Sequence, residues 1–262
     1  MKLYAACMSC LLSGQEKRIR DYQNEDEKAE YMKELMRLIV NSTEETCAPW
    51  LAAQIEKVYE KYFGKNGDYK AIKEEYNRLV MSMEEKLEKK LQQETDPLRA
   101  ALIYARIGNY IDFSAVEKVD QDAFLALFDR KEDVLDEKEY QYFCKELEQS
   151  KTLVYLLDNC GEIVLDKLVI RILKDRYPQL KITAFVRGAE VVNDVTMDDA
   201  IFTGLTEEVE VLSNGDDVAG TILSRLSEEA REKMEKADVI LSKGQGNFES
   251  LYGCGLNVYY LF

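Results

Sequence analysis

The sequence predicts an α/β fold, in which a mostly parallel sheet is covered by helices and preceded by an all-helical region. Apolar residues have helical spacing through most of the first 150 residues, and no strand pattern precedes Thr152. After residue 150, short β-prone runs alternate with helical segments, which is typical of a parallel sheet. We therefore predict a helical domain at residues 1–150 and an α/β domain at residues 151–262.

Composition restricts the class of protein. The chain has 262 residues, enough for a substantial core, and its 35 basic against 50 acidic residues argue against nucleic acid as the main partner. No run of about 18 apolar residues is present, so no membrane span or membrane partner is expected. The first ten residues lack the features of a signal peptide, and we expect a cytoplasmic protein. Nothing in the sequence indicates an oligomeric state.

The chain contains no histidine, which excludes Ser-His-Asp and Cys-His mechanisms and every His-ligated metal site within it. Its six cysteines, without a secretory signal, are expected to be free thiols. Cys7 and Cys10 form a C-x-x-C pair just before a helical pattern. Two interpretations stay open for this pair: small residues packing at a helix start, or a thiol site for a metal or redox role.

Helical patterns fill the region from residue 16 to about residue 143. Residues 69–91 are predicted to form one long helix, with Ile72, Tyr76 and Val80 among its inward residues and its many charges on a solvated face. Strands and helices alternate afterwards. The predicted strands are 152–157, 181–186, 209–212, 238–241 and 257–262, and the predicted helices are 163–177, 198–203, 218–226 and 227–236.

Polar side chains follow three of the predicted strands. The carboxyl ends of parallel strands lie along one edge of a sheet, where ligands bind, so these side chains are expected to converge. They are Asp158, Asn159 and Glu162 after the first strand, Arg187, Asn193 and Asp194 after the second, and Lys243 and Asn247 in a glycine-flanked loop after the fourth.

These residue types suit a site that handles phosphate. Asp158, Asn159 and Asp194 offer oxygen ligands for a divalent cation, and Lys243 offers a positive charge for a phosphate oxygen. The helix that begins after Gly161 would present N–H groups to an anion. Each pattern alone is common in ordinary turns. Their occurrence at three strand ends favours a metal-assisted phosphoryl-transfer site.

Residues 158–164, 193–196 and 242–249 together resemble the damage-control phosphatase family, formerly domain of unknown function eighty-nine. Residues 7–11 and the segments Asp96–Leu98 and 108–112 extend the likeness to its cysteine-containing prokaryotic branch. The resemblance implies a three-layer, Rossmann-like α/β domain with a helical N-terminal domain. It also implies a metal-dependent phosphoric monoester hydrolase of small phosphorylated metabolites, such as sugar phosphates or damaged metabolites. The family further leads us to expect a short additional segment after Phe262.

The resemblance also assigns roles to residues. Asp158, Asn159 and Asp194 would bind the divalent metal, which would be Mn²⁺, Ni²⁺, Co²⁺ or Mg²⁺. Asp158, Asp194 and Lys243 would be the catalytic residues. The substrate-binding residues would be Lys243, Asn247, Glu162 and Arg187.

Two other functions stay open. One is an S-adenosylmethionine-dependent carboxyl methyltransferase, although no glycine-rich loop after the first strand offers room for that cofactor. The other is a non-catalytic metal- or metabolite-binding module that uses the thiols of Cys7 and Cys10. For the phosphatase, attack on phosphorus by a metal-bound water and attack by the Asp158 carboxylate are both consistent with the sequence.

Overall fold

The computed structural model of the chain describes residues 3–43, 46–65, 67, 69–108, 125–128 and 134–262. Asn109 and Asp112, which belong to the resemblance, lie outside these residues. The described helices that precede the sheet are α1 (Ala5–Ile19), α2 (Glu25–Val40), α3 (Ala48–Phe63), α4 (Lys70–Met81), α5 (Glu84–Leu91), α6 (Pro97–Ile107) and α8 (Glu137–Gln149).

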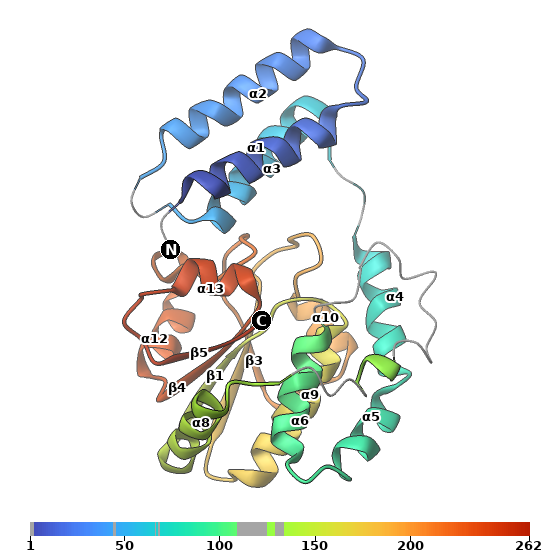
Figure 1. Cartoon of the computed structure of the whole chain (residues 1–262), viewed down its shortest axis with the longest axis vertical. Coiled ribbons are helices and arrows are strands. Elements are labelled where there is room, and N and C mark those ends of the chain that lie inside the picture. Colours follow the sequence, from blue (N-terminus) through green and yellow to red (C-terminus); the bar gives the residue numbers. More distant parts are fainter. Residues whose placement is uncertain (1–2, 44–45, 66, 68, 109–124, 129–133) are drawn as a thin grey trace.

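The sheet has five parallel strands in the order β3-β2-β1-β4-β5, so the first strand in the sequence lies at its centre (Figure 1). The strands are β1 (Thr152–Leu156), β2 (Lys181–Val186), β3 (Glu210–Ser213), β4 (Val239–Lys243) and β5 (Val258–Leu261). The helices between them are α9 (Glu162–Arg176), α10 (Met197–Phe202), α11 (Leu205–Glu208), α12 (Glu228–Lys236) and α13 (Gln245–Leu251). The predicted α/β fold with a mostly parallel sheet is confirmed.

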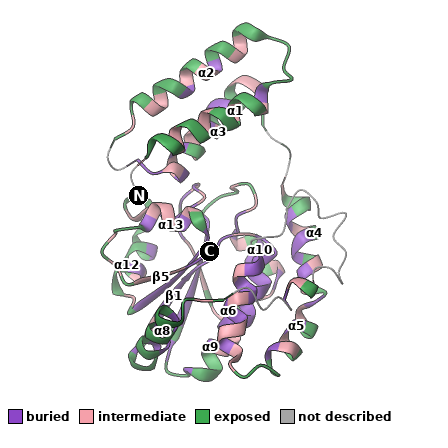
Figure 2. Cartoon of the chain, viewed as in Figure 1, coloured by how far each residue is buried: buried purple, intermediate pink, exposed green. Residues whose placement is uncertain are grey.

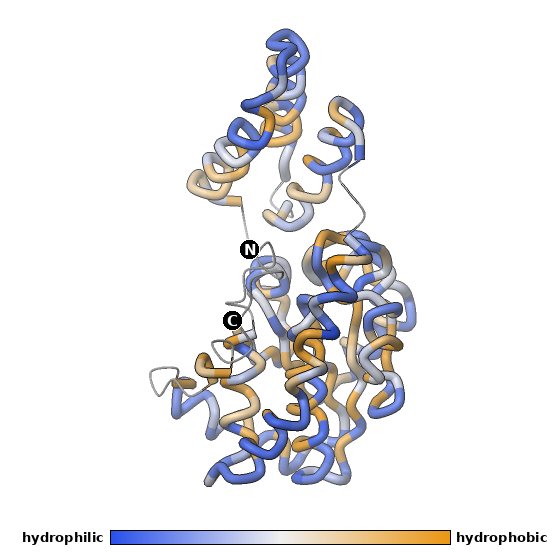
Figure 3. Tube along the Cα trace, turned by 90° about the vertical axis from the view of Figure 1, so that its right-hand side faces the viewer, coloured by the Kyte–Doolittle hydropathy of each residue, from blue (hydrophilic) through white to orange (hydrophobic). Residues whose placement is uncertain are grey.

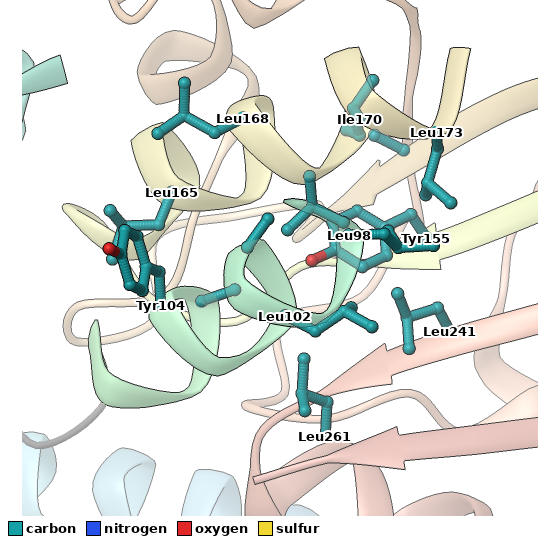
Figure 4. Close-up of a cluster of buried hydrophobic side chains, with 14 of the residues drawn as sticks. Leu98, Leu102, Tyr104, Tyr155, Leu165, Leu168, Ile170, Leu173, Leu241 and Leu261 are labelled. Atoms are coloured by element: carbon teal, nitrogen blue, oxygen red, sulfur yellow. The ribbon is translucent and has the colours of Figure 1, made fainter. Parts of the chain in front are cut away.

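Helices cover both faces of this sheet, which makes three layers. Side chains alternate along a strand, so Leu153 and Tyr155 of β1 join one core while Val154 and Leu156 join another. The larger core lies under α6, α8 and α9, and Figure 4 shows leucines of α6 between α9 and the strands. The smaller core lies under α12 and α13. The three central strands β1, β2 and β4 are almost continuously buried, whereas the edge strands β3 and β5 are mostly only partly buried (Figure 2).

Helices α1–α3 form a separate group with a hydrophobic cluster of their own, which includes Tyr31, Leu51 and Ile55. The group lies beyond the edge of the sheet at which the strands end (Figures 1 and 3). Helices α4–α6 and α8 share no core with it and pack instead with the sheet. The predicted domain boundary at residue 150 separates the helical region from the region that contains strands, and it does not coincide with the division between the two hydrophobic clusters. This boundary stays a prediction. No described helix has the length and apolar content needed to cross a membrane.

Two helix predictions are wrong. Residues 69–91 form two helices, α4 and α5, because the chain turns at Ser82, whose hydroxyl donates to the Leu79 carbonyl. Residues 218–226 contain only a short 3-10 helix at Leu223–Arg225. Their backbone packs against α13 instead, where a Cβ atom on Gly246 would lie 2.1 Å from the Ala219 carbonyl oxygen.

Two smaller corrections concern motifs. The C-x-x-C pair lies within α1, where Cys7 is half-buried and Cys10 is exposed, rather than before a helix. The glycine-flanked segment after β4 is a loop only at Gly244, since α13 begins at Gln245 and carries Asn247. Asn247, which was expected in a loop, therefore lies in a helix.

Candidate active site

The first strand-end turn joins β1 to α9. Asp158 and Asn159 follow the strand, and Gly161 precedes the helix with a φ of 75°, a backbone conformation that favours glycine. Asn159 donates hydrogen bonds from Nδ2 to Asp158 Oδ2 at 2.9 Å and to Glu162 Oε1 at 2.7 Å. These bonds fix the amide beside two carboxylates.

Backbone pairing brings the second turn to the first. Asn159 and Asp194 form an isolated antiparallel bridge, in which Cys160 N–H donates to the Asn193 carbonyl at 2.8 Å. Val195 N–H donates in turn to the Asp158 carbonyl at 2.8 Å. The three residues predicted to bind a metal are therefore neighbours in space, although two separate loops supply them.

Arg187, at the end of β2, lies between the two aspartates. Its Nε donates to Asp194 Oδ2 at 2.5 Å, and its Nη2 lies 3.5 Å from Asp158 Oδ1. Nη1 donates to the Gly220 carbonyl at 2.9 Å and to Asn247 Oδ1 at 3.1 Å. Nη2 is buried and makes no hydrogen bond with the described part of the chain, which leaves this donor for a bound group.

Lys243 is held by two carboxylates. Its Nζ lies 2.8 Å from Glu162 Oε2 and 3.1 Å from Asp166 Oδ1, and the lysine is only 1% exposed. Tyr155 of β1 donates to the same Asp166 oxygen at 2.6 Å. The predicted phosphate-binding lysine is therefore held directly by two carboxylates of α9, one of which is hydrogen-bonded to the central strand.

Asn247 holds the framework together. Its Nδ2 donates to the carbonyls of Lys243 and Leu157, and its Oδ1 accepts from Arg187 and from the Thr221 hydroxyl. It was predicted to bind substrate. In the structure its side-chain amide links β1, β4 and the arginine.

Six charged side chains form one buried group, which we call the buried charge cluster. Its members are Asp158, Glu162, Asp166, Arg187, Asp194 and Lys243. Four acidic groups against two basic ones give the cluster a formal net charge of −2, counted with every member ionised. A net charge of this size is costly in a buried site unless a bound cation compensates it.

The electrostatics of the cluster agree with this count. Burial raises the pKa of Asp158 well above its usual range, and the charges of Asp194 and Glu162 raise it further. Burial also raises the pKa of Asp194, against the opposing effect of Arg187, and raises the pKa of Asp166 to about 6. Burial lowers the pKa of Lys243, but Asp166 and Glu162 outweigh that effect and raise it overall. The positive charges of Arg187 and Lys243 therefore do not fully offset the burial of these carboxyl groups.

The donor set fits a hard divalent cation. Carboxylate and amide oxygens are the ligands that Mg²⁺ and Mn²⁺ prefer, and a charge of +2 would neutralise the cluster. Within the described residues no group of three or more Asp, Glu or Cys side chains converges as a metal site. A cation here would rely on two aspartates, the Asn159 amide and non-protein ligands. For Cys7 and Cys10, a metal role stays a prediction.

Gly244 lets β4 pass close to Asp158. Its φ is 78°, and a Cβ atom there would lie 1.9 Å from Asp158 Oδ2. We expect Gly244→Ala to displace that carboxylate and to lower the hydrolysis of p-nitrophenyl phosphate by about 100-fold, the effect of a displacement near 1 Å. Gly253→Ala is the matched control, because Gly253 has a φ of 80° and open space around it. Both variants carry a backbone strain of about 1–3 kcal/mol. Equal activity of the two variants would contradict this role of Gly244.

Several residues of the site were missed in the sequence. Asp166 is one helical turn after Glu162, in a stretch of α9 that is otherwise mostly apolar, and an acid in such a stretch was the available signal. The charges of α4, including Lys73, were assigned to a solvated face and Asn77 was not singled out, yet both residues are buried, and Ile72 is exposed instead. The pattern of charges in this helix gave no sign that it faces a polar site.

The chain is similar to known proteins over nearly its whole length. Residues 3–261 match the family described as the damage-control phosphatase ARMT1-like domain. A damage-control phosphatase of Archaeoglobus fulgidus is 30% identical, over 96% of this chain and 88% of that protein. One of Pyrococcus horikoshii is 29% identical, over 96% and 86%. The crystal structure of a DUF89 family protein from P. horikoshii superposes with a TM-score of 0.79 at 22% identity, covering 99% of this chain and 90% of that one.

Proposed function

Because the chain belongs to the damage-control phosphatase ARMT1-like domain family, we propose that it is a metal-dependent phosphatase of small phosphorylated metabolites. Sugar phosphates and damaged metabolites are the substrate class. The observation that carries the metal dependence is the net charge of −2 on the buried charge cluster. An anionic substrate would not enter such a cluster without a bound cation, because like charges repel strongly in a buried site.

In this proposal, Asp158, Asn159 and Asp194 hold the cation. A bound divalent cation supplies Lewis-acid polarisation of a phosphoryl oxygen and lowers the pKa of water. Arg187 contributes Nη2, which makes an ion pair with Asp158 but no hydrogen bond within the described residues, as a donor to a phosphoryl oxygen, and Lys243 contributes a second positive charge. Glu162 holds Lys243 and the Asn159 amide at once, so it sets the position of the lysine relative to the cation.

Metal removal tests the proposal. Protein stripped with a chelator should release no phosphate from a set of sugar phosphates and nucleotides, and Mn²⁺, Ni²⁺, Co²⁺ or Mg²⁺ should restore release for at least one of them. Free phosphate is the readout, and chelator-treated protein without added metal is the control. Full activity after chelation would contradict metal dependence. Tight calorimetric binding of S-adenosylmethionine without metal would favour the methyltransferase instead.

The cellular setting remains part of the proposal. All six cysteines are free thiols, which is consistent with a reducing compartment such as the cytoplasm. The acidic composition favours a small phosphorylated substrate over nucleic acid. Both are expectations to be tested together with the substrate.

A further inference from the structure

One amide side chain of the helical region links the first turn of the site to α10, the helix that follows the second turn. Asn77 lies on α4 and is completely buried. Its Oδ1 accepts a hydrogen bond from Gly161 N–H at 2.6 Å, in the turn that carries Asp158 and Asn159. Its Nδ2 donates to Asp199 Oδ1 at 2.9 Å, in the segment that carries Asp194. Asn77 therefore links two segments that the chain places far apart in sequence.

Asp199 transmits this link to the second turn. Its Oδ2 accepts hydrogen bonds from the backbone N–H and the hydroxyl of Thr196, both at 2.9 Å, which caps α10. The same oxygen lies 2.7 Å from Lys73 Nζ, one helical turn before Asn77 on α4. With Oδ2 occupied in this way, Oδ1 is left for the Asn77 amide. The amide orientation is thereby fixed, with its oxygen toward Gly161.

The first turn is also confined sterically. A Cβ atom on Gly161 would lie 2.3 Å from the ring of Tyr76, the residue before Asn77 on α4. The turn is thus in contact with the Tyr76 ring and hydrogen-bonded to the Asn77 amide. Helix α4 contacts both the Gly161 turn and α10 through a single polar face, formed by Lys73, Tyr76 and Asn77.

We infer that Asn77 is a positioning residue that sets the spacing between the two cation-binding turns. The inference rests on the proposed function, since it concerns the cation held by Asp158, Asn159 and Asp194. Ligand oxygens on two separate loops must reach one ion at about 2.0–2.6 Å, so small shifts of either loop weaken binding. Groups that orient metal ligands typically contribute 10- to 100-fold to metal affinity.

Calorimetric titration of Mn²⁺ into the chelator-stripped full chain tests this role. Asn77→Ala should raise the dissociation constant for Mn²⁺ by about 10- to 100-fold. At saturating Mn²⁺, kcat for p-nitrophenyl phosphate should fall much less than the metal affinity. Thr203→Val is the matched control, because Thr203 is buried and donates to the backbone carbonyl of Asp199 within the same helical segment, not to the Asp199 carboxylate that Asn77 contacts. Its Mn²⁺ affinity should equal that of the unaltered protein.

A swap of the two partners separates positioning from simple loss of stability. In Asn77→Asp combined with Asp199→Asn, a carboxylate still accepts from Gly161 N–H and an amide still donates across the same contact. The double variant should bind Mn²⁺ more tightly than Asn77→Asp alone or Asp199→Asn alone. If Asn77→Ala does not fold, this comparison tests the positioning role instead. Equal Mn²⁺ affinity in Asn77→Ala and the unaltered protein, or no recovery in the swap, would overturn the inference. Failure of the unaltered protein to bind Mn²⁺ would overturn the proposed function itself.

Discussion

Asp158→Asn is expected to reduce metal-dependent phosphate release by roughly 1,000-fold, because a cation held by the site contributes several kcal/mol to the reaction. The substitution keeps the shape of the side chain and the backbone contacts of the turn. It removes one negative charge from the buried charge cluster and one anionic ligand from the cation. We therefore expect weaker Mn²⁺ binding as well as slower turnover.

The measurement is phosphate release and calorimetric Mn²⁺ binding on the same preparations. Asp238→Asn is the matched control, since Asp238 also flanks a strand but accepts hydrogen bonds from Lys151 and Thr152 N–H at the opposite edge of the sheet. The control should keep its activity and its Mn²⁺ affinity. Activity of Asp158→Asn within tenfold of the unaltered protein would rule out Asp158 as an essential ligand.

Lys243→Met is expected to abolish phosphate release and to lower the free energy of unfolding by about 3–5 kcal/mol. Lys243 lies between Glu162 and Asp166, both almost fully buried, so its removal leaves two uncompensated carboxylates. Methionine keeps most of the side-chain volume, so the loss reports the charge rather than a cavity. Urea unfolding in the presence of chelator is the measurement.

A second substitution separates charge from packing. Combining Lys243→Met with Asp166→Asn removes one of the two stranded carboxylates, and Tyr155 can still donate to the remaining amide oxygen. The double variant should therefore be more stable than Lys243→Met alone, while still lacking activity. A Lys243→Met protein within 1 kcal/mol of the unaltered stability would show that the buried ion pairs contribute little.

The strand-end residues were predictable because parallel strands finish at one edge of a sheet. Asp158, Asn159, Asp194 and Lys243 follow three apolar runs, and the alternation of strands with helices implied that edge. The sequence did not indicate the backbone bridge between Asn159 and Asp194, because loop pairing leaves no periodic pattern. Nor did it indicate the position of Arg187 between the two aspartates.

The residues of α4 were missed for a different physical reason. Charged and amide side chains on a helix usually face water, so the periodicity favoured a core face with Ile72 inside. In the structure Lys73 is buried, because it pairs with Asp199 and Glu190, and Ile72 is exposed. Tertiary ion pairs reversed the preference of the local pattern. A helix that packs against a polar site buries polar residues. The sequence alone does not indicate which helix packs in this way.

The position of the bound metal tests the central claim most directly. Crystals grown with Mn²⁺ and measured with anomalous scattering at the manganese absorption edge would locate the ion without reference to activity. The account predicts one strong peak at roughly 2–2.5 Å from oxygens of Asp158, Asn159 and Asp194. A peak at Cys7 and Cys10 instead, or none beside the two aspartates at saturating Mn²⁺, would contradict it.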